Sequence, residues 1–272
     1  MPGLGAPSAV RLAAPHTRVE RAGRTGASDR YAVLAHFSTE PQVSLSFRSL
    51  VEALVGLGHQ VVVVSSATCP EPLDWADAEL GDTRVLRKPN VGYDFGSWAV
   101  GLAMTPEAAR AEHVVLANDS LVGPFAPIDS LLDRFYRSPA DVWGLTETLQ
   151  FTRHLQSYFL GFRGGVLTEP PLARFWAGVR HYEDKQLVIH RNEIGLGQLL
   201  QAEGYAVDAA FVAGHVVDPA DNPTIAGWRT LLDRGMPFVK REIVRSPELA
   251  PQGDEIADEL RRRYGVEVSE WI

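Results

Sequence analysis

Short apolar segments alternate with amphipathic ones along the first half of the chain. Apolar runs of strand length occur at residues 31–37, 60–65, 83–86 and 113–117. Apolar side chains at helical spacing occur at residues 47–57 and 95–104. The run QVVVVS at 60–65 is rich in β-branched residues and is typical of a buried strand. This alternation of strands and helices predicts a parallel sheet with right-handed crossovers.

The second half of the chain shows the same two patterns less regularly. We expect helices at residues 128–136, 172–180, 192–203, 224–233 and 254–263, and strands at 141–146, 155–162 and 205–212. The chain contains no internal repeat and no long linker. The sequence therefore predicts the α/β fold class, with a mostly parallel central sheet flanked by helices in a single domain.

The first 28 residues differ from the rest. Arg, Pro and Gly are scattered through them, and they lack the apolar central run of a secretory signal. We expect residues 1–28 to form a flexible tail, followed by one domain over residues 29–272.

Composition and charge exclude several classes of protein. Asp and Glu outnumber Lys and Arg by 34 to 26, and the formal net charge of −8 argues against a general nucleic-acid partner. The single cysteine, Cys69, cannot form an intramolecular disulfide, which fits a reducing compartment such as the cytoplasm. No apolar run approaches the ~20 residues that a membrane span requires.

Ligands of an open parallel sheet bind beyond the carboxyl ends of its strands, and the segment after the strand at 83–86 is rich in polar residues and glycine. Gly92 and Gly96 permit close backbone approach, Asn90 and Asp94 provide polar atoms, and Tyr93 provides a flat face. A phosphate or a base fits these residue types. A structural turn with buried aromatic residues explains them equally well.

The strand at 113–117 ends in a second candidate, Asn118-Asp119-Ser120. One carboxylate at a strand end can hold a hard divalent cation with the help of substrate phosphates and water. The alternative is a turn or helix cap, since Asn, Asp and Ser are common capping residues.

The third candidate is Glu193, in the first turn of the helix predicted at 192–203. A carboxylate there is stabilised by the helix dipole, which is also the ordinary explanation for an acidic residue at such a position. His154 has the most polar surroundings of the histidines, although a structural role is more common for a single histidine.

Six blocks of the sequence, in order from about residue 30 to 245, together resemble the rhamnan synthesis F family, glycosyltransferases of bacterial surface polysaccharide assembly. The blocks are NVGYDFGSW at 90–98, NDSLVGPF at 118–125, WGLT at 143–146, HLQSYF at 154–159, NEIGL at 192–196 continuing to GY at 204–205, and PFVKR at 237–241.

This resemblance implies a GT-A-like domain. Residues 29–125 would be the half that binds a nucleotide sugar, 126–245 the acceptor and catalytic half, and 246–272 a C-terminal helix. The residues that we expect to bind the donor are Asn90, Gly92, Tyr93, Asp94, Gly96, Asn118, Asp119, Ser120, Lys240 and Arg241. The acceptor side is assigned to Trp143, Gln156 and Tyr158.

The resemblance also implies catalytic roles. Asn118-Asp119-Ser120 occupies the place of the Asp-x-Asp motif of GT-A enzymes, so Asp119 is the carboxylate that would bind Mg²⁺ or Mn²⁺. Asn192-Glu193 stands where an inverting enzyme usually has Glu-Asp, which leaves Glu193 as the general base, with His154 beside the reaction.

We therefore expect an inverting transferase that uses a dTDP-rhamnose-like donor and a glycan or lipid-linked glycan acceptor. Such an acceptor implies a cytoplasmic protein with a peripheral contact at the inner face of the plasma membrane. Because two of the three motif positions at 118–120 lack a carboxylate, a non-catalytic nucleotide-sugar or glycan-binding module is the alternative. A methyltransferase is disfavoured because residues 38–41, after the first strand, contain no glycine.

Overall fold

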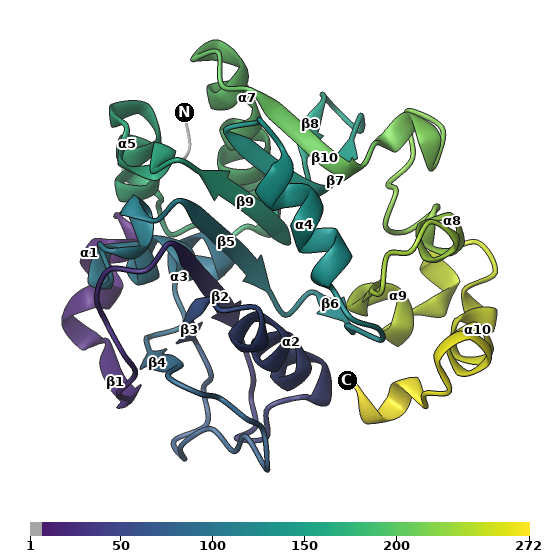
Figure 1. Ribbon diagram of the computed structural model, residues 1–272, viewed down its shortest axis with the longest axis horizontal. Helices are drawn as coiled ribbons and strands as arrows, with labels where there is room; N and C mark the ends of the chain where they lie inside the picture. Colours follow the sequence, from purple (N-terminus) through teal and green to yellow (C-terminus); the bar gives the residue numbers. More distant parts are fainter. Residues whose placement is uncertain (1–6) are drawn as a thin grey trace.

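The computed structural model describes residues 7–272, and over these residues the fold is α/β (Figure 1). Its main sheet has nine strands within the described chain, in the order β1-β4-β3-β2-β5-β9-β7-β10, with β8 paired to β7. The strands are β1 Arg18–Arg21, β2 Arg30–His36, β3 Gln60–Ser65, β4 Arg84–Arg87, β5 His113–Asn118, β7 Val142–Thr148, β8 His154–Leu155, β9 Phe159–Arg163 and β10 Val207–Phe211.

The sheet is mixed. Strands β4, β3, β2 and β5 are parallel to one another, and β7 is parallel to β10. Strand β9 lies between β5 and β7 and is antiparallel to both. The beginning of β9 therefore lies at the same edge of the sheet as the carboxyl ends of β5 and β7, which is where an α/β sheet binds its ligands.

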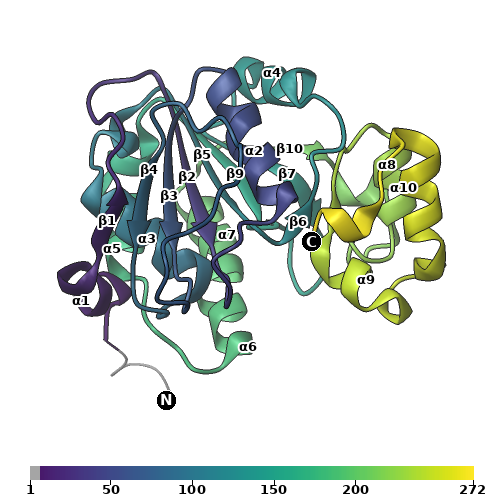
Figure 2. The same ribbon diagram turned by 90° about the horizontal axis from the view of Figure 1, so that it is seen from below.

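Helices cover both faces of the sheet (Figures 1 and 2). One face packs against α2 Leu45–Gly56 and α4 Asp129–Arg137. The other packs against α1 Ala9–Ala13, α3 Tyr93–Met104, α5 Pro170–Gly178 and α7 Ile194–Ala202. Helix α6, Lys185–Val188, precedes α7. Each apolar cluster takes alternate residues of the same strands, as in Val62 and Val63, because successive side chains of a strand point to opposite faces.

The last part of the chain forms a small lobe beside the sheet (Figure 2). It contains α8 Trp228–Asp233, α9 Arg241–Arg245 and α10 Ile256–Tyr264, which share an apolar cluster of their own. A two-stranded ribbon connects the lobe to the main sheet. In this ribbon β11, Val239–Lys240, pairs with β6, Leu121–Val122, which follows β5 directly.

Most of the predicted strands and helices are confirmed, including those of the less regular second half, and one predicted strand is divided in two. The predicted strand at 60–65 matches β3, and the helix at 95–104 is part of α3. The single strand predicted at 155–162 is instead two strands, β8 and β9. They flank the turn residues Gln156, Ser157 and Tyr158, and the first two of these interrupt the apolar run.

The prediction of a flexible tail is wrong for residues 7–28; residues 1–6 lie outside the described part of the chain. Residues 9–13 form helix α1, in which Ala9 and Ala13 are fully buried, and β1 pairs with β4 at the edge of the sheet. The segment escapes a composition-based prediction because alanine is a small residue that gains its contacts by close packing rather than by apolar bulk.

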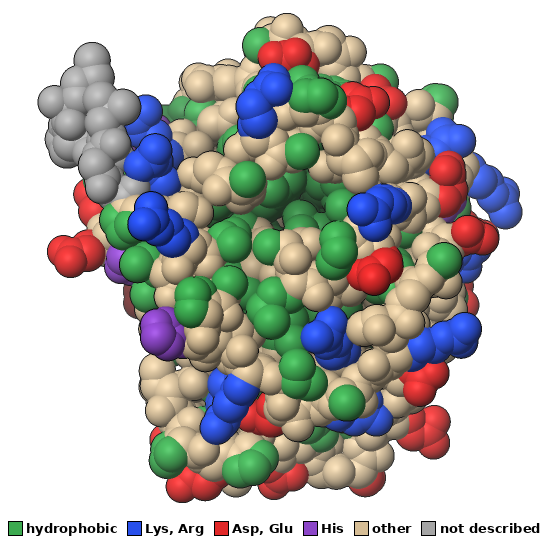
Figure 3. Space-filling view, turned by 90° about the vertical axis from the view of Figure 1, so that its left-hand side faces the viewer, with side chains coloured by type: hydrophobic (Ala, Val, Ile, Leu, Met, Phe, Trp, Pro, Cys, Tyr) green, Lys and Arg blue, Asp and Glu red, His purple; other side chains and the backbone are tan. Residues whose placement is uncertain are grey.

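Glycine in α3 makes the packing of α1 possible. A Cβ on Gly92 would lie 2.8 Å from the Cβ of Ala9, and a Cβ on Gly96 would lie 2.9 Å from the carbonyl oxygen of Val91 and 3.2 Å from Ala9. Figure 3 shows the side of the molecule that carries α1 and α5, where hydrophobic side chains gather in a hollow. Among the described residues, no helix is long and apolar enough to cross a membrane.

Enlarging Ala9 tests whether this N-terminal segment is part of the core. We expect Ala9→Leu to lower the free energy of unfolding by about 1–3 kcal/mol, the usual cost of overpacking a closed contact. The matched control is His16→Leu, which adds apolar bulk at an exposed position of the same segment. Urea denaturation followed by circular dichroism measures both; equal stability of the two variants would contradict the packing of α1.

Candidate active site

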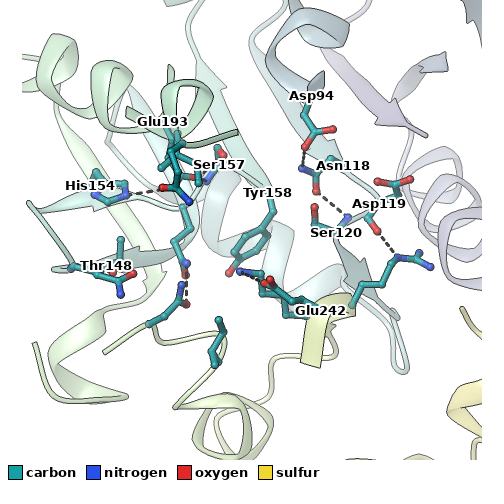
Figure 4. A pocket seen from close by; sticks show the side chains of 18 of the residues that line it. Asp94, Asn118, Asp119, Ser120, Thr148, His154, Ser157, Tyr158, Glu193 and Glu242 are labelled. Carbon is teal, nitrogen blue, oxygen red and sulfur yellow. Dashed lines mark hydrogen bonds and ion pairs between the residues drawn. The ribbon is translucent and has the colours of Figure 1, made fainter. Parts of the chain in front are cut away.

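A cavity of about 730 Å³ opens at the edge where β5 and β7 end and β9 begins. Figure 4 shows two groups of polar side chains on opposite sides of it, with Tyr158 between them. Of the predicted site residues, the cavity brings together Asp94, Asn118, Asp119, Ser120, His154, Gln156, Tyr158, Glu193, Lys240 and Arg241. Residues from five separate parts of the chain thus share one cavity.

The first group is centred on the end of β5. The Asn118 side chain donates a hydrogen bond to Asp94 (2.6 Å) and accepts one from the Ser120 backbone N–H (3.0 Å). One oxygen of Asp119 accepts the backbone N–H of Phe37, which follows the neighbouring strand β2, at 3.0 Å. Asp94 comes after β4, which is separated from β5 by the two strands β3 and β2. Asp94 nevertheless contacts Asn118 at the end of β5, because Asp94 lies in the first turn of α3.

The positive side chains on this side of the cavity belong to β11 and to α9, which follows it directly. Arg241 donates from Nε to the backbone carbonyl of Asp119 (2.7 Å), and its own N–H donates to the carbonyl of Ser120 (2.8 Å). Burial lowers the pKa of the Arg241 guanidinium, and the negative charge of Asp119 opposes that effect. Lys240 and Arg245 also line the cavity, with Lys240 Nζ 3.3 Å from Glu242.

The second group holds Glu193 (Figure 4). One carboxylate oxygen accepts two hydrogen bonds from Ser157, one from its backbone N–H at 2.8 Å and one from its hydroxyl. The other lies 3.5 Å from Nε2 of His154, and the Glu193 side chain remains 22% exposed to the cavity. The carboxylate is thus fixed in place and still accessible.

The protonation of His154 follows from its two neighbours. Nδ1 lies 2.8 Å from the carbonyl oxygen of Thr152, which can only accept, so Nδ1 carries a proton. A second proton on Nε2 lets the ring face the carboxylate of Glu193 as an imidazolium.

The pKa values of the pair agree with this arrangement. Burial alone would lower the pKa of His154, but the bond to Glu193 raises it above its ordinary 6.5. Burial alone would raise the pKa of Glu193, but the bonds from His154 and Ser157 lower it below its ordinary 4.5. Glu193 is therefore a carboxylate, ready to accept a proton, at neutral pH.

Glu193 is the last residue of a π-helical turn, Ile189–Glu193, which joins α6 directly to α7, so the prediction that Glu193 lies in the first turn of a helix is wrong. Such turns are rare and frequently occur at functional sites. The start of α7 packs against β8 without space between them, since a Cβ on Gly197 would lie 2.7 Å from the Cβ of His154. Gly197 thus sets the distance between the helix of Glu193 and the strand of His154.

The floor of the cavity is a network of neutral groups. The Tyr158 hydroxyl hydrogen bonds to the hydroxyl of Thr146, which donates to Gln156 Oε1 (2.7 Å). Gln156 Nε2 donates in turn to Asn222 Oδ1 at 3.1 Å. Burial raises the pKa of Tyr158, so it stays neutral.

The structure places five predicted site residues outside the cavity lining. Trp143 is buried in the core against Phe135 and Phe159, because its strand points that side chain into the face covered by α4. Gly92 and Gly96 serve the packing of α1. Asn90 is exposed on the preceding loop, and Tyr93 donates its hydroxyl to the carbonyl of Glu183 (3.3 Å). Within residues 90–96, Gly92 and Gly96 thus have a packing role, whereas Asp94 lines the cavity.

Sequence reasoning missed several residues of the site. Ser157 lies inside the block HLQSYF, but a serine in a short turn gives no signal of its own. Lys88 lies outside the cavity lining: it is buried beneath the loop after β4 and donates to the carbonyls of Pro89 (3.1 Å) and Val91 (2.8 Å). Burial lowers its pKa to about 8, against the opposing charge of Asp94.

Residues 61–269 match the family described as rhamnan synthesis protein F, which is more than half of the chain. The chain belongs to this family. The predicted resemblance is confirmed, and membership assigns the protein to polysaccharide biosynthesis.

Two curated relatives show the same level of similarity. The chain is 27% identical over 208 residues to "Virulence protein VirA" of Vibrio anguillarum, covering 63% of this chain and 67% of that protein. It is 28% identical over 216 residues to "Uncharacterized protein y4gN" of Sinorhizobium fredii (strain NBRC 101917 / NGR234), covering 78% of this chain and 56% of that protein.

Two glycines of α7 offer a matched test of the Glu193–His154 pair. We expect Gly197→Ala to push α7 away from His154, to lower the free energy of unfolding by about 1–3 kcal/mol, and to lower the pKa of His154 as Glu193 withdraws. Gly195→Ala adds the same methyl group where its nearest neighbour is 3.7 Å away. It should leave that pKa unchanged and stabilise the helix by up to about 1 kcal/mol. NMR titration of the histidine ring protons and urea denaturation measure both; an unaltered pKa in Gly197→Ala would contradict the assignment.

Proposed function

We propose that this protein transfers a sugar from a nucleotide donor to a growing polysaccharide, with inversion, on a GT-A-like domain. The observation that carries the proposal is the shared cavity: an ionised carboxylate, Glu193, faces Asp119 and the positive side chains of the ribbon across one space. Its volume of about 730 Å³ is in the range of ligand sites.

The Asp119 side of the cavity is proposed to bind the donor diphosphate. The bond between the anomeric carbon and the diphosphate breaks, and its electron pair leaves with the diphosphate, which gains negative charge. Lys240, Arg241 and Arg245 stand on that side and would stabilise the charge. The backbone anchors of Arg241 keep its guanidinium in place before the donor arrives.

A divalent cation fits this side through a small protein donor set. Across residues 7–272 no cluster of three or more His, Cys, Asp or Glu side chains could hold a metal ion. Asp119 and the Ser120 hydroxyl line the cavity, and magnesium binds readily through one carboxylate together with substrate phosphates and water. When bound there, Mg²⁺ or Mn²⁺ would neutralise charge on the diphosphate.

The Glu193 side is proposed to hold the acceptor. As the acceptor oxygen forms its bond to the anomeric carbon, its proton passes to Glu193, whose lowered pKa keeps it unprotonated beforehand. Ser157 and His154 position the carboxylate, and the amides of Gln150 and Gln156 suit the hydroxyl groups of a sugar.

The identity of the donor is proposed from the family description, whose rhamnan is a polymer of rhamnose. A dTDP-rhamnose-like donor and a glycan or lipid-linked glycan acceptor follow from it. A lipid-linked acceptor implies that the reaction takes place in the cytoplasm, at the inner face of the plasma membrane. A non-catalytic binding module remains the second candidate. Asn118 stands where the Asp-x-Asp motif has a carboxylate, and its side-chain amide donates a hydrogen bond to Asp94.

Glu193→Gln separates these candidates. In a transferase the variant should lose at least about 100-fold in turnover, because the base is gone, while donor binding is retained. The matched control is Glu203→Gln, the same change at an exposed position just after α7. Release of nucleoside diphosphate measures turnover and calorimetry measures binding. Undiminished turnover in Glu193→Gln would reject Glu193 as the base, and a wild-type protein that binds every donor without turnover would reject the transferase proposal.

Metal dependence tests Asp119. We expect chelation to abolish transfer, added Mg²⁺ or Mn²⁺ to restore it, and Asp119→Asn to raise the metal concentration needed for half-maximal activity. Asp133→Asn, an exposed site on α4, serves as the control. Full activity in the presence of a chelator would contradict a role for a metal ion. Lys240, Arg241 and Arg245 would then be the groups that stabilise the charge of the diphosphate.

A further inference from the structure

We propose that Phe151 is the platform on which a sugar ring of the acceptor stacks in the cavity. The proposal rests on the proposed function for the reaction that follows, and it adds the residue that selects a carbohydrate ring as the acceptor. No block of the sequence resemblance includes Phe151.

The first observation is exposure. Phe151 lines the cavity, and the residue is 75% exposed, the largest value among the exposed large hydrophobic residues of the described chain. Burial of a phenylalanine side chain is favourable, so an aromatic ring left in solvent at a cavity is unfavourable for the free protein. A ligand that covers the ring recovers this burial.

The second observation is the backbone. Phe151 has a φ of +67°, and the Thr152 N–H donates to the carbonyl of Gln150 at 2.9 Å. An i→i+2 hydrogen bond around a positive φ is a γ-turn of the rare, strained kind. Aromatic residues seldom adopt such a conformation, and strained residues cluster at ligand sites.

The surrounding bonds hold the turn in this conformation. Before it, Thr148 Oγ1 accepts the Gln150 N–H at 3.1 Å. After it, Arg153 donates to the buried carboxylate of Glu147 at 2.6 Å. The carbonyl of Thr152 is the acceptor of the His154 ring, so the turn that presents Phe151 also orients the partner of Glu193.

The position of the turn indicates which substrate the ring meets. Thr148, where the loop begins, and His154, where it ends, lie on the Glu193 side of the cavity, opposite Asp94 and Asp119 (Figure 4). The Phe151 ring also lies 6.0 Å from the ring of His190, in the π-helical turn that contains Glu193. Phe151 is therefore placed for the acceptor and not for the diphosphate.

A pyranose ring suits this platform. One of its faces presents mainly C–H groups, which are apolar and carry slight positive charge, and an aromatic face is apolar and slightly negative. The neighbouring amides of Gln150 and Gln186 line the same cavity and supply partners for hydroxyl groups at the ring edge.

Three replacements of Phe151 test the proposal, with a rhamnan oligosaccharide as the probe and calorimetry in the presence of dTDP as the readout. We expect Phe151→Ala to weaken oligosaccharide binding about 10-fold or more, since it removes the apolar surface, and Phe151→Trp to retain binding. The affinity for dTDP alone should not change. Leu249→Ala, which truncates an exposed residue of the C-terminal lobe, is the control.

Phe151→Gly distinguishes a binding role from a structural one. Glycine adopts a positive φ without strain, so this variant should have a higher thermal midpoint than Phe151→Ala and should still lose oligosaccharide affinity. If Phe151 had only a structural role, Phe151→Gly would recover both its stability and its affinity for the oligosaccharide.

The outcomes separate this inference from the proposed function. Oligosaccharide binding that depends on Phe151 without any sugar transfer would retain the platform and reject the transferase. Transfer with an unchanged acceptor KM in Phe151→Ala would retain the transferase and reject the platform. A wild-type protein that binds no oligosaccharide in the presence of dTDP would also overturn the platform.

Discussion

The candidate site depends on how one carboxylate is held. Glu193 accepts two hydrogen bonds from Ser157 and lies 3.5 Å from the ring of His154, and these partners stabilise its negative charge although burial opposes it. An ionised carboxylate without such partners would be costly in these surroundings. Because His154 is fixed in turn by the carbonyl of Thr152, the position of the carboxylate is determined by backbone geometry on both sides.

The reversed direction of β9 makes this arrangement possible. In a wholly parallel sheet the segment before β9 would lie at the opposite edge, far from the end of β5. Since β9 is antiparallel to β5 and β7, Ser157 and Tyr158, which precede β9, lie at the edge where Asp119 follows β5. The ribbon of β6 and β11 then brings Arg241 to the same place from late in the chain. The two groups of polar side chains consequently face each other across one cavity (Figure 4).

The sequence reveals most strands of the sheet but only part of the site. The valines at 60–65 are buried on both faces, so their pattern identifies β3 directly. Trp143 misled the prediction because an aromatic residue in a strand looks the same whether it faces a ligand or the core. Gly92 misled it because close helix packing and phosphate binding both require a missing side chain. The exposure of Phe151 arises from a backbone turn that no periodicity records.

A crystal structure with bound dTDP would show whether the cavity is a nucleotide-sugar site. We expect the diphosphate to lie in the cavity at the end of β5, beside Asp119 and Arg241, with Glu193 across a space that fits a sugar. A nucleotide bound elsewhere on the protein, or a diphosphate that contacts neither Asp119 nor Arg241, would contradict this expectation.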